Sequence, residues 1–252
     1  MNDACCDVLC LGPHPDDVEI ALGGTLALLS ARGRSVWVAD LTRGELGSNA
    51  DPDERRDEAL AAAGVLGLSG RVQLSLPDGL VSAHDSDQVG AVVGVLRRCR
   101  PRWVLVAPEP RRHPDHLATP SLVRRAAFLS RLASYQPSTP QAQWWPGPPD
   151  GEVARSWICE RVGVTALAEE QPSLIFDVSG HWSAKLAALD CHASQFRRDP
   201  GRLATHINDQ DFLPSIADRA RFWGRRAGVA RGEAIVTTVV PVLDDLPPEA
   251  WA

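Results

Sequence analysis

Residues 9–19 read Leu9-Cys10-Leu11-Gly12-Pro13-His14-Pro15-Asp16-Asp17-Val18-Glu19. The apolar run that ends at Leu11 is typical of a buried strand, and a Gly-Pro pair ends it. The apolar pattern that follows predicts a helix over residues 22–32. His14, Asp16 and Asp17 should therefore lie on a strand-to-helix loop. In an open parallel sheet such a loop sits at the carboxyl edge, where ligands bind.

The composition sets bounds on the class of protein. The chain has 252 residues, of which 44% are hydrophobic and 23% charged, and this is typical of a soluble globular protein. We expect one domain over residues 1–252, with a core part over 1–135 and a pocket-rim and C-terminal part over 136–252. The formal charge of −6 argues against nucleic acid as a partner, because binding phosphates requires a field of basic residues.

The cysteines and the apolar runs indicate the cellular setting. No apolar run reaches the roughly 18 residues that span a bilayer, and the N-terminus lacks the basic and apolar segments of a signal peptide. We therefore expect a cytoplasmic protein without a membrane partner. The six cysteines show neither zinc-finger spacing nor a CxxC motif, which favours free thiols in a reducing compartment. The adjacent Cys5 and Cys6 have no assigned role.

Strand and helix patterns alternate through the first half of the chain. The expected strands cover residues 6–11, 35–41, 71–76 and 102–107, and the expected helices cover 22–32, 52–66 and 87–98. Strands separated by helices of this length imply right-handed crossovers and a parallel sheet with helices on both faces. The fold class is therefore α/β, a Rossmann-like, mostly parallel sheet sandwiched by helices.

The second half of the chain is less regular and predicts an irregular C-terminal extension. Residues 136–151 are rich in Pro, Gln and Trp, so we expect a loop there, with strands resuming on either side of Pro172. Helices are expected over 181–196 and 209–227, and an edge strand over 233–240. The sequence does not fix the oligomeric state, but Trp182, Phe222 and Trp223 can pack between subunits, which leaves a homo-oligomer open.

A second motif follows the fourth expected strand. It reads Arg111-Arg112-His113-Pro114-Asp115-His116. Both motif loops follow sheet strands and can face one crevice, where His14, Asp17 and His116 would supply three metal ligands. Three such ligands with an open fourth position are typical of a catalytic Zn²⁺, which lowers the pKa of its water from 15.7 to about 7. Fe²⁺, Co²⁺ and Mn²⁺ also suit a site of this kind.

The remaining residues of the two motifs suit acid–base chemistry. Asp16 is placed to act as the general base, and His113 can stabilise an oxyanion or protonate a leaving amine. Asp115 is available to orient the His113 ring. A single such stretch is more often a turn with a capping aspartate, but two of them, each after a strand, favour chemistry. The isolated histidines are assigned to the surface or to helix packing: His84, His181, His192 and His206.

These residues resemble the PIG-L/LmbE-type zinc-dependent de-N-acetylases, which remove acetyl groups from N-acetylglucosamine conjugates. The resemblance implies zinc on His14, Asp17 and His116, Asp16 as base and His113 as electrostatic or acid partner. Further landmarks of the family occur in order: residues 42–47, Arg55 with Glu58-Ala59, residues 76–79, Lys185, residues 194–196, 219–224 and 232–234. The downstream landmarks are similar to the branch of bacillithiol biosynthesis, whose members deacetylate N-acetylglucosaminyl-malate.

The resemblance also suggests substrate contacts. Arg55 is the preferred contact for the malyl carboxylates, since arginine pairs bidentately with a carboxylate. Glu45 and Ser48 are expected on the sugar side. Pro13 stands where the family usually has a small residue, and residues 136–171 match poorly. These differences concern fine specificity.

Other functions remain open at this stage. Within the same chemistry, the substrate can be the inositol conjugate of mycothiol synthesis, a chitin oligomer or a thiol–sugar conjugate cleaved by an amidase. A non-catalytic Rossmann-type nucleotide-binding protein is a remote alternative, because the glycines at 12, 23 and 24 do not form GxGxxG. A non-catalytic metal-binding subunit is a third, and Asp16 argues against it.

Overall fold

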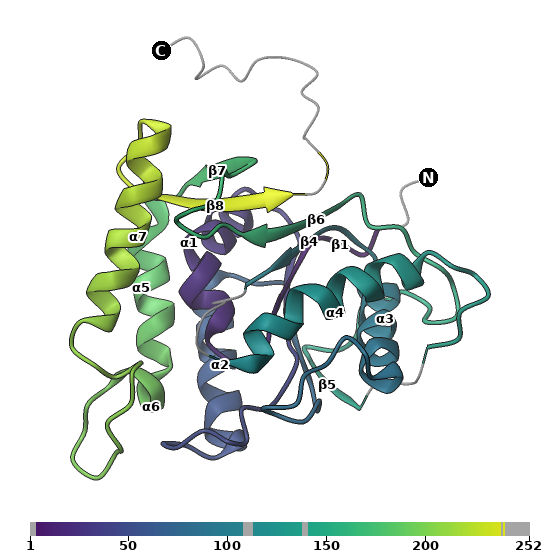
Figure 1. Ribbon diagram of the computed structural model, residues 1–252, viewed down its shortest axis with the longest axis horizontal. Helices are drawn as coiled ribbons and strands as arrows, with labels where there is room; N and C mark the ends of the chain where they lie inside the picture. Colours follow the sequence, from purple (N-terminus) through teal and green to yellow (C-terminus); the bar gives the residue numbers. More distant parts are fainter. Residues whose placement is uncertain (1–3, 108–112, 138–140, 238, 240–252) are drawn as a thin grey trace.

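The computed structural model describes residues 4–107, 113–137, 141–237 and 239. A single sheet crosses the molecule, and helices cover both of its faces (Figure 1). Its strands are β1 (Cys6–Gly12), β2 (Val36–Asp40), β3 (Gly70–Leu74), β4 (Pro101–Val106), β5 (Ala142–Trp145), β6 (Arg161–Thr165), β7 (Leu174–Asp177) and β8 (Gly232–Thr237). The two halves of the chain therefore contribute to one sheet.

The sheet is parallel at its centre and antiparallel at its edges. The strand order is β5-β3-β2-β1-β4-β6-β8-β7. Strands β3, β2, β1, β4 and β6 pair in parallel, whereas β5 is antiparallel to β3, and β8 is antiparallel to both β6 and β7. This arrangement confirms the predicted Rossmann-like, mostly parallel sheet.

The helices form layers on the two faces of the sheet. They are α1 (Asp17–Ala31), α2 (Pro52–Leu66), α3 (Ser86–Cys99), α4 (Pro114–Ser130), α5 (Trp182–Cys191), α6 (Ala193–Phe196) and α7 (Phe212–Ala227), with a short 3₁₀ turn over Ser179–His181. Helices α3 and α4 pack on one face, and α1, α2 and α5 pack on the other (Figure 1). Helix α7 lies outside α1 and α5, against which its apolar side packs.

The central strand β1 is buried on both sides. Leu9 and Leu11 pack into the cluster under α3 and α4, whereas Val8 and Cys10 pack into the cluster under α1 and α2. Side chains alternate between faces along a strand, so a strand covered on both faces needs apolar residues at every position. This explains the unbroken apolar run in the sequence.

Successive strands are added to the sheet on one side of β1 and then on its other side, and this switch creates the crevice of the fold. The chain leaves β1 toward β2 and β3 on one side and later returns to β4 on the other side. The segments that follow β1 and β4 therefore part from each other at the carboxyl edge, and such a switch point is where open α/β sheets bind ligands. The Ala107 amide donates to the Leu11 carbonyl at 2.9 Å, which fixes where the two segments separate.

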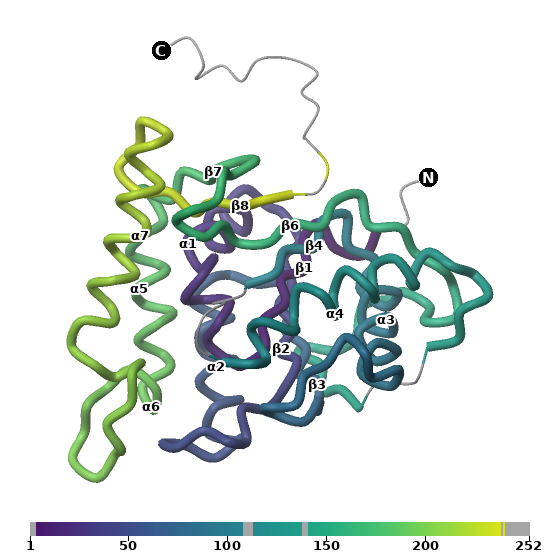
Figure 2. Tube along the Cα trace, viewed as in Figure 1, coloured from purple at the N-terminus to yellow at the C-terminus, as the bar shows by residue number. Residues whose placement is uncertain are grey.

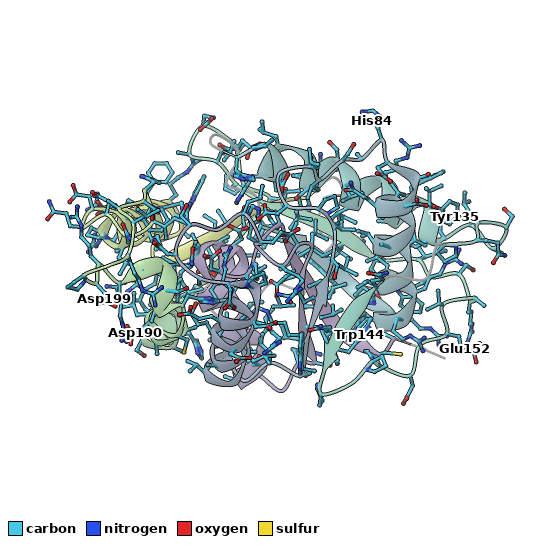
Figure 3. All side chains as sticks on the ribbon, turned by 90° about the horizontal axis from the view of Figure 1, so that it is seen from below. His84, Tyr135, Trp144, Glu152, Asp190 and Asp199 are labelled. Atoms are coloured by element: carbon cyan, nitrogen blue, oxygen red, sulfur yellow. The ribbon has the colours of Figure 1, made fainter. Side chains whose placement is uncertain are left out.

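The second half of the chain corrects two predictions about strands. The segment 136–151, expected as a loop, contains β5, which carries Trp144 (Figure 3) and pairs with β3. Trp144 packs against Trp37 with ring centroids 6.1 Å apart. The strand expected at an edge, β8, lies inside the sheet between β6 and β7. It was also expected to continue to residue 240, which lies outside the described residues.

Two differences from the predicted helix boundaries concern α1 and α5. Helix α1 begins at Asp17 rather than residue 22, so this carboxylate lies in its first turn. The helix expected over 181–196 is interrupted at His192, whose ψ of 52° leaves the helical region.

Trp182 and Trp223, proposed for a subunit contact, are buried in the chain's own core, whereas Phe222 is exposed. Among the described residues, no helix is both long and apolar enough to cross a bilayer.

Candidate metal centre and active-site pocket

Three side chains from the two motif loops meet at the crevice. The Nδ1 atom of His14 lies 3.1 Å from Oδ2 of Asp17, and Nε2 of His116 lies 3.3 Å from Oδ1 of Asp17. One ligand atom from each residue lies within 4.8 Å of the others, and all three side chains are buried. Two imidazole nitrogens and a carboxylate suit a divalent transition metal, so this donor set fits the expected ion.

A carboxylate that the sequence analysis did not assign orients His14. The Nε2 atom of His14 lies 3.0 Å from Oδ1 of Asp78, on the segment that follows β3. The other oxygen of Asp78 accepts the Leu46 amide at 2.9 Å. Burial opposes ionisation of Asp78, but the His14 ring and the Leu46 amide outweigh it and lower its pKa to about 2. The ionised carboxylate therefore accepts the Nε2 proton of His14, and Nδ1, the nitrogen that faces Asp17, is the one that would bind the metal.

Asp16 belongs to no such donor pair and is held differently. It is 1% exposed, and its φ of 120° lies where non-glycine residues are rare. It precedes α1, yet its side chain forms no capping bond there, whereas Asp51 and Asp85 cap α2 and α3 through their carboxylates. The capping-aspartate explanation of the motif therefore does not hold for Asp16. Burial raises its pKa to about 6, against the opposing charge of Arg55.

The guanidinium group of Arg55 forms hydrogen bonds with other groups of the protein. Its Nη2 atom donates to the carbonyl of Pro15 at 2.7 Å and to Oδ2 of Asp16 at 3.3 Å, and Nη1 donates to the carbonyl of Gly44 at 3.3 Å. The residue is 5% exposed and still lines the pocket. Its contacts differ from the expected role as a malyl anchor, because they orient the carboxylate of Asp16.

His113 and Asp115 do not form the expected ring–carboxylate pair. Their closest atoms, Nδ1 of His113 and Oδ2 of Asp115, are 3.9 Å apart, which is too long for a hydrogen bond. The carboxylate of Asp115 instead accepts the amides of Gly79 and Val81, at 2.8 and 3.0 Å, and lies 3.4 Å from His14. Asp115 therefore fixes the segment that carries Asp78.

The ring of His113 is held by the N-terminus of α4. Its Nδ1 atom accepts the backbone amide of Asp115 at 3.3 Å, so Nε2 carries the proton of the neutral ring. Its face meets the edge of His14, with centroids 4.7 Å apart. Burial and the neighbouring His14 lower the pKa of His113, which favours the neutral form. The ring thus offers an N–H donor to the pocket that it lines.

These groups form the floor of a pocket of about 310 Å³. Its wall comes from the second half of the chain and from the segment after β2; the wall residues are Leu46, Gly47, Ser48, Gln195, Thr205, His206, Ile207 and Phe212. Ser48 lines the pocket as expected for the sugar side. Glu45 instead accepts the backbone amides of Arg43 and Asp78, at 3.2 and 2.9 Å. Arg111 and Arg112 lie outside the described residues.

Two features of the site escaped the sequence analysis. Asp78 is 64 positions from its partner His14, so no local spacing connects them. Two signals could have found it: its position shortly after β3, at the same edge as the two motifs, and its place in the family landmark at residues 76–79. His206 was assigned to the surface or to helix packing, and it is exposed, but it also lines the pocket.

Comparison with known proteins places this site in a functional context. A model of the PIG-L family, described as GlcNAc-PI de-N-acetylase, matches residues 9–127, which include both motif loops. The conserved protein TT1542 from Thermus thermophilus has a similar structure, with a TM-score of 0.78 and 31% sequence identity over 94% of this chain and 97% of that protein.

Three deacetylases align with most of the chain. The 1D-myo-inositol 2-acetamido-2-deoxy-alpha-D-glucopyranoside deacetylase of Rhodococcus erythropolis is 27% identical, over 75% of this chain and 80% of the relative. The diacetylchitobiose deacetylase of Thermococcus kodakarensis is 28% identical, over 90% and 81%. The probable N-acetyl-alpha-D-glucosaminyl L-malate deacetylase 2 of Bacillus cereus is 28% identical, over 75% and 83%.

Proposed function

The chain belongs to the PIG-L family of de-N-acetylases, and from that premise we propose that it hydrolyses the acetamido group of an N-acetylglucosamine conjugate with the help of a bound divalent metal. The observation that carries the proposal is the position of Asp16. It is a buried carboxylate beside the donor set of His14, Asp17 and His116, and it caps no helix. A site that only binds a metal has no use for such a group.

His14, Asp17 and His116 would hold the metal, and we propose Zn²⁺, although Fe²⁺, Co²⁺ and Mn²⁺ also suit these ligands. A divalent ion there supplies Lewis-acid activation of water and of the amide carbonyl. The side chains around the ion accept and donate the protons of the reaction. Asp16 accepts a proton from the attacking water, and Arg55 keeps that carboxylate aimed into the pocket.

His113 acts on the other side of the scissile bond. Its Nε2–H donates a hydrogen bond to the oxygen of the amide, on which negative charge develops as water adds. When the C–N bond breaks, the nitrogen of the sugar needs a proton, and Asp16 returns to it the proton that it took from water. The products are the free amine of the conjugate and acetate, so the water is fully accounted for.

The catalytic role of Asp16 is tested by Asp16→Asn. The amide cannot accept the proton of water, so we expect acetate release by the zinc-loaded protein to fall roughly 100-fold or more, while the zinc content is unchanged. Acetate is measured enzymatically and zinc by elemental analysis. Asp190→Asn is the matched control, because Asp190 lies on the exposed side of α5 and pairs with Arg197. Turnover retained in Asp16→Asn would reassign the base, with His113 next.

The conjugate itself is a second question. We propose N-acetylglucosaminyl-malate, the substrate of bacillithiol synthesis, as the first conjugate to assay, beside the inositol conjugate and a chitin oligomer. The sequence-based argument for malate rests on the downstream landmarks, with Arg55 as the preferred anion contact. The bonds of Arg55 to Asp16 and to two carbonyls would compete with an anion, so residues at the mouth of the pocket are further candidates for selecting the conjugate.

A further inference from the structure

The pocket has a buried floor and an exposed mouth, which defines how a substrate enters it. His14, Asp16 and His116 on the floor are at most 7% exposed. Ser48 and His206, which line the same pocket, are exposed. If the proposed function holds, the acetamido group must reach the floor. The group attached to the sugar then lies along the mouth, where Ser48 and His206 are within its reach.

Two segments far apart in the sequence are joined at this mouth. The Oδ1 atom of Asn49 accepts the amide of Leu203 at 2.7 Å, and its Nδ2 atom donates to the carbonyl of Leu203 at 3.0 Å. Nη1 of Arg202 donates to the carbonyl of Asn49 at 2.6 Å. The segment after β2 and the segment between α6 and α7 therefore lie side by side (Figure 2). One asparagine side chain pairs with both polar backbone groups of Leu203.

The ring of His206 is fixed above the pocket. It meets the ring of Phe212 at a centroid distance of 5.2 Å and an interplanar angle of 85°. Phe212 is 5% exposed and packs at the start of α7 with Ile20 and Ile216. An imidazole presents two ring nitrogens that can form hydrogen bonds, and here they belong to a ring that packs against a core residue.

Nearby cations are paired within the protein. Arg43 bonds to Asp53 at 2.8 Å, Arg55 to Asp16 at 3.3 Å and Arg202 to Glu54 at 3.0 Å. These three guanidinium groups are therefore engaged with carboxylates of the protein. His206 is the pocket-lining side chain that combines exposure, a fixed ring and hydrogen-bonding capacity.

We propose that His206 is a specificity-determining residue, which selects the group attached to the sugar through a hydrogen bond to one of its hydroxyl or carboxylate oxygens. Asn49 is a positioning residue, which keeps the His206 segment over the pocket through its two bonds to Leu203. The inference rests on the proposed function and adds the chemistry of the selected group. That group bears oxygen hydrogen-bonding atoms.

The experiment compares three substrates with the zinc-loaded full chain. They are the malyl conjugate and the inositol conjugate of N-acetylglucosamine, and its methyl glycoside, which lacks a large polar group. For each variant, we measure the ratio of kcat/KM for a polar conjugate to kcat/KM for the methyl glycoside. In His206→Ala this ratio falls roughly three- to tenfold, the range expected for loss of one hydrogen bond. In Asn49→Ala it falls in the same direction, with the loss in KM more than in kcat.

His84→Ala is the matched control. His84 is an exposed histidine at the periphery of the molecule, far from Asp199 of the α6–α7 segment (Figure 3), and its replacement leaves the ratio unchanged. A loss confined to the malyl conjugate identifies a carboxylate as the selected group, and one confined to the inositol conjugate identifies a hydroxyl.

Two results would count against the inference. In one, His206→Ala lowers all three kcat/KM values by the same factor; in the other, His84→Ala changes the ratio as much as His206→Ala does. If the wild-type protein releases acetate neither from these three substrates nor from a chitin oligomer, the proposed function itself is contradicted.

Discussion

At the scale of single residues, the Asp78 side chain decides which nitrogen of His14 faces the metal donors. Because Asp78 is ionised and lies 3.0 Å from Nε2, it accepts the proton of that nitrogen, and Nδ1, which lies 3.1 Å from Asp17, is the nitrogen that would bind the metal. The same carboxylate accepts the amide of Leu46, so its own position is fixed by the backbone. The geometry of the metal ligands therefore depends on a residue outside both motifs.

We expect Asp78→Asn to weaken zinc binding roughly 10- to 100-fold, the usual effect of removing a carboxylate that supports a ligand histidine. The amide can still accept the Leu46 bond, but its other end is then a donor that faces the donor of His14. Competition with a chelator of known affinity measures the change. Asp57→Asn, at an exposed acid of α2, is the control. An unchanged zinc affinity would show that Asp78 does not orient His14.

At the scale of elements, a buried ionic group locks the start of α1 to the sheet. Arg71 on β3 bonds to both oxygens of Asp40 on β2, at 2.6 and 2.7 Å, and to Glu19 on α1 at 2.6 Å. All three side chains are at most 1% exposed. Glu19 lies within one turn of Asp16 and Asp17, so this group fixes the part of α1 that carries the proposed base and a proposed metal ligand.

Replacing Arg71 by Met should destabilise the fold by about 3–5 kcal/mol at pH 7, because it leaves two buried carboxylates without their cation. Burial opposes ionisation of Glu19, yet Arg71 and His192 outweigh it and lower its pKa, so its contribution to stability in the wild type is present above about pH 4.5 and lost as the pH falls further. In the variant both carboxylates become protonated more readily.

The difference in stability between wild type and Arg71→Met should therefore shrink toward acidic pH. Urea unfolding of both proteins at several pH values measures it. The triple variant Arg71→Met, Glu19→Gln, Asp40→Asn removes the buried charges together and should recover part of the loss. A difference that stays constant with pH would assign the loss to packing around Arg71 rather than to charge.

Local sequence signals predicted some elements well and others poorly. The boundaries of α2 follow from Asp51 as N-cap, Pro52 in the first turn and Gly67 with φ of 66° at the end, and all of these can be read from neighbouring residues. By contrast, β5 forms because Trp144 and its neighbours pair with β3, about 70 positions earlier in the chain. A Pro-rich segment gives no local sign of such pairing.

The same distinction applies to the site at the scale of the whole molecule. The meeting of His14, Asp17 and His116 was predictable, because each motif is local and both follow strands that the topology places beside each other. The roles of Asp78, Arg55 and His206 depend on contacts between distant segments, such as the pairing of Asn49 with Leu203. No periodicity within one segment encodes these contacts, so the walls of the pocket required the structure.

Because the proposed metal ligands come from both sides of the switch point at β1, metal binding should couple to the stability of the entire fold. The ion would join the segment after β1 to the first turn of α4, and the unfolded chain does not hold these two segments together. At a free zinc concentration 100 times Kd, binding stabilises the folded state by about 2.7 kcal/mol. For a chain of this size, this corresponds to a change in Tm of roughly 5–10 °C.

We therefore expect a strong chelator to lower Tm by that amount, measured by scanning calorimetry, and zinc to restore it. His116→Ala should melt at the same temperature with and without the chelator, whereas His84→Ala should keep the full shift. Equal Tm values for the wild type in zinc and in chelator would show that the ion does not bridge the two segments.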